Sequence, residues 1–163
     1  MRFATALGAL GAVSFVTLST ASIAAEMRGV TATEIKIGQT MPYSGPASAY
    51  GVIGKADLAY FKMINDQGGI NGRKLTLLSY DDGYSPPKTV EQVRRLVEQE
   101  HVAFLANTLG TPTNAAIRQY LNDNKAPQLF VLSGAPMFAD PEHYPWTIGF
   151  MPSYFTEIGR AHV

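Results

Sequence analysis

The sequence predicts an α/β fold, a doubly wound and mainly parallel sheet, from three observations. Short strand-like runs alternate with segments of helical periodicity from Glu34 onward, and this alternation is typical of βαβ units. Glycine, proline and Asp-Gly turns separate the segments. No internal repeat or low-complexity linker interrupts the pattern. Right-handed crossovers would then place helices on both faces of one open sheet.

The first half of the pattern is a strand, a helix and a second strand. Isoleucines alternate with other residues in 34–40, which predicts the first strand, and 75–80 is apolar enough for a buried one. Between them, Ile53, Ala56, Tyr60 and Ile64 recur at helical spacing and predict a helix. A Gly-Gly pair follows, as a helix C-terminus favours.

The second half repeats the alternation. Two prolines after Ser85 predict the start of a helix with Val90, Val93 and Val97 on one face. Thr111 is expected to cap the following helix, because proline stands directly after it. Three further strands are predicted at 102–106, 127–132 and 146–150.

The loops after the strands are the expected binding region, because open α/β sheets bind ligands beyond the carboxyl ends of their strands. Tyr50 would supply an aromatic wall there. Near the helix start after Thr111, hydrogen-bond donors are expected to hold a carboxylate. The donors are the hydroxyls of Thr108, Thr111 and Ser133 and the amides around Gly110 and Ala135. Capping or turn formation is the alternative role for Thr111 and Ser133.

Residue patterns of catalysis are not found. Asp81-Asp82 precedes a glycine and is interpreted as a turn. His101, His143 and His162 form no pair with metal-ligand spacing. Neither a complete phosphate-binding glycine motif nor a Gly-x-Ser-x-Gly elbow is present. We therefore expect a binding protein for a small molecule, with no enzyme activity, no metal and no cofactor.

Charge and composition narrow the partners. The chain of 163 residues has 13 basic and 13 acidic side chains, no cysteine and a hydrophobic fraction of 46%, as expected of one globular domain. Without a basic patch, neither nucleic acid nor an anionic membrane surface is an expected partner. Without cysteine, core packing must provide the stability.

Both ends of the chain carry special signals. Residues 1–25 predict a cleaved signal peptide, because Arg2 precedes an uncharged apolar run and small residues surround Ala25. A permanent anchor would need about 20 strongly apolar residues, and glycine, serine and threonine dilute this run. Export to the periplasm follows. Residues 158–163 back-translate to a widely used sequencing adapter and are interpreted as an artefact, the alternative being an ordinary helix start.

Six segments together resemble the leucine/isoleucine/valine-binding protein family of periplasmic binding proteins, and the likeness covers 33–157. They are Ile35-Lys36-Ile37-Gly38, Ser44-Gly45-Pro46, Tyr50-Gly51, the Ile-Asn-Asp-Gln-Gly-Gly-Ile-Asn-Gly stretch from Ile64 to Gly72, Tyr80-Asp81-Asp82, and Leu109-Gly110-Thr111-Pro112-Thr113-Asn114.

The resemblance implies an N-terminal fragment of a two-lobed protein that closes on a ligand. Residues 26–150 would be the first Rossmann-like lobe, and 151–157 would begin the crossover to a second lobe. Ligand contacts carried over by position are Tyr50, Leu109, Gly110, Thr111, Gly134 and Ala135, and Ser133 joins them from the donors above. Gly110 and Pro136 replace a serine and a threonine of the amino-acid binders, so the ligand could be a branched-chain or hydrophobic amino acid or an aromatic acid.

The implied function is the exported substrate-binding component of an ABC importer. It would act as a monomer and deliver its ligand to an inner-membrane permease with its ATPase. The alternative is the ligand-sensing domain of a receptor or regulator with the same fold, and a Rossmann-type enzyme comes third.

Overall fold

The computed structural model describes residues 27–160, so the predicted signal peptide and the last three residues lie outside it. Its sheet has five parallel strands in the order β2-β1-β3-β4-β5. The predicted α/β fold with a parallel sheet is therefore confirmed. The strands are β1 (Glu34–Met41), β2 (Lys74–Asp81), β3 (Phe104–Ala106), β4 (Gln128–Val131) and β5 (Thr147–Gly149).

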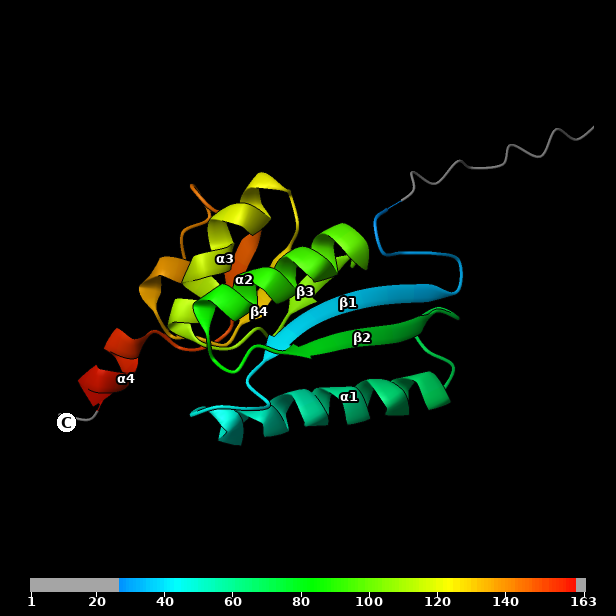
Figure 1. Cartoon of the computed structure of the whole chain (residues 1–163), viewed down its shortest axis with the longest axis horizontal. Coiled ribbons are helices and arrows are strands. Elements are labelled where there is room, and N and C mark those ends of the chain that lie inside the picture. Colours follow the sequence, from blue (N-terminus) through cyan, green and yellow to red (C-terminus); the bar gives the residue numbers. More distant parts are fainter. Residues whose placement is uncertain (1–26, 161–163) are drawn as a thin grey trace, which may run out of the picture.

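Helices cover both faces of this sheet, as the doubly wound fold requires. Figure 1 shows α1 on one side and the packed pair α2 and α3 on the other. The helix α4 extends away from the sheet at the C-terminal end (Figure 1). The helices are α1 (Gly51–Asp66), α2 (Pro86–Arg94), α3 (Thr111–Asp123) and α4 (Tyr154–Arg160), with short helical turns η1 (Ser48–Tyr50), η2 (Arg95–Gln99, a π-helix) and η3 (Pro136–Phe138).

The main core lies between the sheet and the α2–α3 layer. It contains Val93 from α2, Leu96 from η2, Leu105 from β3, and Ile117 and Leu121 from α3, all at most 1% exposed. Burying one such side chain contributes about 1.5–3 kcal/mol. The predicted valine face of α2 is confirmed, because its central valine is fully buried.

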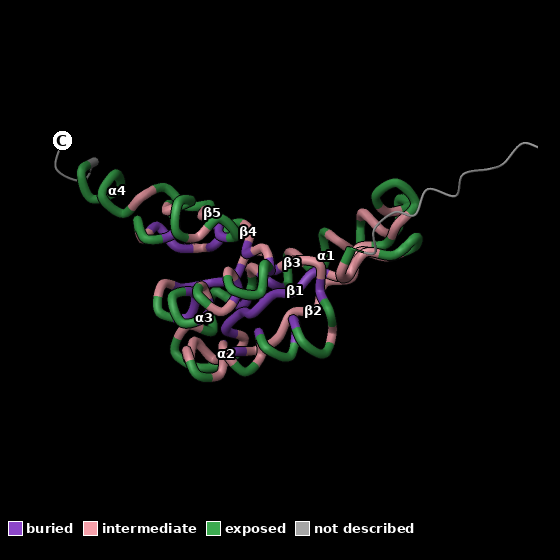
Figure 2. Tube along the Cα trace, turned by 90° about the horizontal axis from the view of Figure 1, so that it is seen from above, coloured by how far each residue is buried: buried purple, intermediate pink, exposed green. Residues whose placement is uncertain are grey.

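The opposite face of the sheet is less covered. Helix α1 packs on β1 and β2, and only Gly51 and Gly54 within it are buried. Figure 2 shows α1 and α4 as mostly exposed and the central strands as buried. On β5, the Thr147 hydroxyl accepts a hydrogen bond from Asn122 of α3. Because side chains alternate along a strand, the neighbouring Ile148, which is exposed, points to the other face.

Element boundaries differ from the prediction mainly where a strand is short. The third strand begins at Phe104 and not at Val102, because the Val102 N–H still donates to the Leu96 carbonyl of η2 at 3.1 Å. The expected cap at Thr111 is wrong. The N-cap is Gly110 at φ +99°, and Thr111 is the first helical residue, with no side-chain cap. Its hydroxyl has a partner elsewhere.

Candidate functional site

The two hydroxyls predicted at the strand ends lie together. Thr111 Oγ1 and Ser133 Oγ are 2.7 Å apart, although 22 residues separate them in sequence. The loops after β3 and β4 meet here through a bridge between Leu109 and Leu132, and Leu132 donates its N–H to the Thr108 carbonyl at 3.0 Å. We call Thr111 and Ser133 the hydroxyl pair.

The backbone amides predicted as free donors are already used. The Gly110 N–H donates to the Leu132 carbonyl at 3.2 Å. The Ala135 N–H donates to Ser133 Oγ, also at 3.2 Å. The interpretation of both amides as ligand donors therefore needs correction, since parallel pairing and the turn after β4 take them up. The Thr111 N–H remains, because the first turn of a helix offers no carbonyl to it.

Tyr84 covers the loop after β3, which the sequence reasoning missed. A Cβ added at Gly110 would lie 2.4 Å from a ring carbon of Tyr84, so only glycine allows this ring so close. Tyr84 is fixed by the turn before it, where Asp82 accepts its N–H at 2.9 Å and the Thr89 hydroxyl at 3.0 Å. The interpretation of Asp81-Asp82 as a turn is thus confirmed, and Asp81 accepts the Gly83 N–H in the same turn.

Asp81 also ties the loop after β1 to α2. Its carboxylate accepts hydrogen bonds from Ser44 and forms an ion pair with Lys88 at 3.0 Å. Burial raises the pKa of Asp81, but the hydrogen bonds from Ser44, Lys88 and the Gly83 N–H outweigh burial and hold the pKa well below its usual range. Asp81 is therefore a charged anchor for the loops that lead to the site.

Tyr154 covers the loop after β4 and was also missed. Its N–H donates to the Gly134 carbonyl at 2.8 Å. The nearby hydroxyls of Ser133 and Thr111 lower the pKa of Tyr154. Tyr50 lies at the end of η1 and is 56% exposed. Burial raises the pKa of Tyr84, and Tyr154 and Tyr50 add to this effect. Tyr84 and Tyr154 thus pack against Gly110 and Gly134, the residues next to Thr111 and Ser133.

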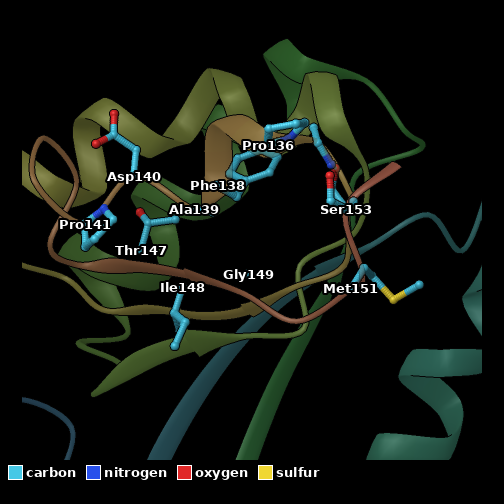
Figure 3. A pocket seen from close by; sticks show the side chains of 13 residues that line it. Pro136, Phe138, Ala139, Asp140, Pro141, Thr147, Ile148, Gly149, Met151 and Ser153 are labelled. Carbon is cyan, nitrogen blue, oxygen red and sulfur yellow. The ribbon is translucent and has the colours of Figure 1, made fainter. Parts of the chain in front are cut away.

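An apolar hollow of about 400 Å³ adjoins this group. Ser133, Gly134 and Ala135 line it, whereas Tyr50, Thr111 and Tyr154 do not. Figure 3 shows it between the η3 segment with Pro136 and Phe138 and the chain that carries Ile148 and Met151. The other lining residues are Ala139, Asp140, Pro141, Thr147, Gly149 and Ser153. Hydroxyl groups and apolar surface therefore meet in the loop after β4.

Metal sites and membrane-spanning helices are both absent from residues 27–160. Within that range no group of three or more His, Cys, Asp or Glu side chains could hold a metal ion. In the same range, no helix is long and apolar enough to cross a membrane. His143 is exposed and contacts Asp140 at 3.0 Å.

Comparison with known proteins identifies the family of this chain. A family model described as periplasmic binding protein matches residues 34–161. The Leu/Ile/Val-binding protein homolog 7 of Brucella suis biovar 1 (strain 1330) is 29% identical over 120 residues, which are 72% of this chain and 28% of that protein. The chain thus spans little more than a quarter of that relative.

Solved structures have the same fold. A possible leucine/isoleucine/valine-binding protein from Rhodopirellula baltica SH 1 superposes with a TM-score of 0.73 at 24% identity, over 85% of this chain and 36% of that one. A fatty acid ABC transporter substrate-binding protein from Thermomonospora curvata gives 0.54 at 28% identity, over 62% and 26%. With the family match across the whole described sheet, this chain belongs to the periplasmic binding protein family.

Proposed function

We propose that this chain is the first lobe of the exported, periplasmic substrate-binding component of an ABC importer, and that it captures a small solute with a carboxylate and an apolar body. The observation that supports this most is the hydroxyl pair, 2.7 Å apart, next to an apolar hollow of about 400 Å³. A polar end and an apolar wall in one concave region are typical of small-molecule sites.

The polar end suits an anion better than a neutral group. The free N–H of Thr111 stands at the start of α3, where the helix dipole favours negative charge. Among residues 27–160, no carboxylate hydrogen-bonds to Thr111 or Ser133. The Asp81 carboxylate is bonded to Ser44 and Lys88. Asp140 lines the adjoining hollow and contacts His143 at 3.0 Å, so the hydroxyl pair itself would meet a ligand carboxylate with no acid bonded to it.

The remaining parts of the proposal concern the whole protein. The relatives are far longer than this chain, which supports a second lobe that closes over the ligand. The segment 151–157 leaves the sheet and enters α4, as a crossover to that lobe would. We further propose a monomer that delivers its ligand to a membrane permease and ATPase.

Calorimetric titration of the full-length protein tests the ligand class. The panel is L-leucine, benzoate and octanoate, with L-leucinamide and benzamide as uncharged controls of the same shape. We expect at least one carboxylate to bind with micromolar affinity or better and its amide to bind at least tenfold more weakly, because a hydrogen bond to a charged group is worth about 1.5–3 kcal/mol. Equal binding of acid and amide would contradict the proposal.

A further inference from the structure

We propose that Tyr154 is a ligand-contacting residue whose phenol joins Thr111 and Ser133 as the third hydroxyl of the carboxylate site. This inference rests on the proposed function. It assigns a specificity role to a residue of the segment 151–157, which the sequence indicated only as a connection between lobes. Three observations support it: the fixed backbone of Tyr154, the fit of its ring, and the proton count of the hydroxyl pair.

The backbone of Tyr154 is held to the loop after β4. Its N–H donates to the Gly134 carbonyl at 2.8 Å. Gly134 follows Ser133 directly in sequence. This hydrogen bond therefore holds the backbone nitrogen of Tyr154 next to the neighbour of Ser133. Tyr154 is 42% exposed, which leaves part of the residue accessible to a ligand.

The ring of Tyr154 fits against the glycine. A Cβ at Gly134 would lie 2.5 Å and 2.7 Å from two carbons of the Tyr154 ring and 2.5 Å from the Pro152 carbonyl oxygen. Real Cβ atoms do not come so close to backbone or ring atoms. Gly134 is therefore required where the segment 151–157 packs on the loop, and the position of the phenol is determined by that packing.

The hydroxyl pair alone has too few protons for a carboxylate. Each hydroxyl carries one proton, and within the pair one proton is used for the 2.7 Å hydrogen bond. The pair therefore has a single proton left for a ligand with two carboxylate oxygens. The Tyr154 ring packs on Gly134, the neighbour of Ser133, and its phenol proton would be another donor for the ligand. Its ring can in addition lie against the apolar body of the ligand.

The experiment compares Tyr154→Phe with wild type in the full-length protein. Tyr60→Phe is the matched control, because Tyr60 lies on α1 and is 56% exposed. Affinities are measured for whichever carboxylate of the panel binds and for its amide or, for octanoate, octanamide. We expect Tyr154→Phe to lower carboxylate affinity about tenfold, to leave amide affinity within about twofold, and to leave the melting temperature unchanged. Tyr60→Phe should change none of these quantities.

The outcomes separate the two proposals. If Thr111→Val weakens carboxylate binding and Tyr154→Phe does not, the proposed function stands and the role of Tyr154 is refuted. If Tyr154→Phe weakens acid and amide equally, its hydroxyl does not select the charge, which also overturns the inference. If wild type binds no carboxylate of the panel, the proposed function fails and the role of Tyr154 falls with it.

Discussion

Asn114 offers the sharpest test of how the fold positions the site. Its side chain is fully buried, and its Oδ1 accepts from the Thr108 hydroxyl at 2.5 Å and from Gln128 Nε2 at 2.7 Å. Its Nδ2 donates to the carbonyls of Thr108 and Gly110 at 3.0 and 2.6 Å. Asn114 thereby joins α3, β4 and the loop before the hydroxyl pair. We consider the substitution Asn114→Leu, which is close in volume.

The expected magnitude follows from the partners that Asn114→Leu leaves behind. Both carbonyls keep another donor, from the Leu132 and Asn114 backbone amides. The Thr108 hydroxyl and the Gln128 amide lose their acceptor, apart from a 3.5 Å contact with each other. A buried donor without an acceptor costs about 1–3 kcal/mol. Two such donors lower the free energy of unfolding by about 2–6 kcal/mol, a large share of the 5–15 kcal/mol typical of a domain.

The assay is urea denaturation of the 163-residue chain, followed by circular dichroism. Asn124→Leu is the control, because Asn124 is exposed and its side chain bonds one carbonyl of its own helix. The control should change the free energy of unfolding by less than about 0.5 kcal/mol. A loss below about 1 kcal/mol in Asn114→Leu would refute the reasoning, since the buried donors would then have found other partners.

Three further predictions follow. Thr111→Val should weaken carboxylate binding by about 1.5–3 kcal/mol at most without lowering the melting temperature, because Thr111 is not a helix cap; a lowered melting temperature with intact affinity would support the capping role. Gly134→Ala should destabilise the protein by about 1–3 kcal/mol in thermal denaturation, because the methyl group meets Tyr154 and the Pro152 carbonyl; unchanged stability would contradict that packing. Asp81 has a lowered pKa, so its stabilisation is complete above about pH 4 and is lost as the pH falls below that value. Asp81→Asn should therefore flatten the acid limb of a stability profile, and an unchanged limb would contradict the charged anchor.

The order of strands and helices could be predicted because it depends on local periodicity. Val93 shows this clearly, since its helical spacing predicted a buried face and the residue is fully buried. The role of Thr111 could not be predicted in the same way. A threonine before proline is usually a cap, but here Gly110 takes the cap position at φ +99°, and the Thr111 hydroxyl turns to a residue of another strand end.

The two tyrosines of the site were missed for a physical reason. Tyr84 and Tyr154 reach the site through contacts between loops, and neither contact has a periodicity that a single sequence displays. A weaker signal was available in the glycines. Gly110 and Gly134 each stand where a side chain would collide with one of these rings, so a glycine beside a predicted ligand hydroxyl indicates that a large group packs on it.

The site combines parts of different stability, which bears on how a ligand could act on the protein. The hydroxyl pair stands on strand ends that the buried side chains of Asn114 and Gln128 fix to α3. Tyr154 instead belongs to a segment that leaves the sheet (Figure 1), and its contacts with Gly134 are one backbone hydrogen bond and ring packing. A carboxylate bound by all three hydroxyls would add hydrogen bonds between the rigid sheet and that segment. Such a ligand stabilises one orientation of the segment over others, because a ligand shifts a conformational equilibrium by its difference in affinity for the two states.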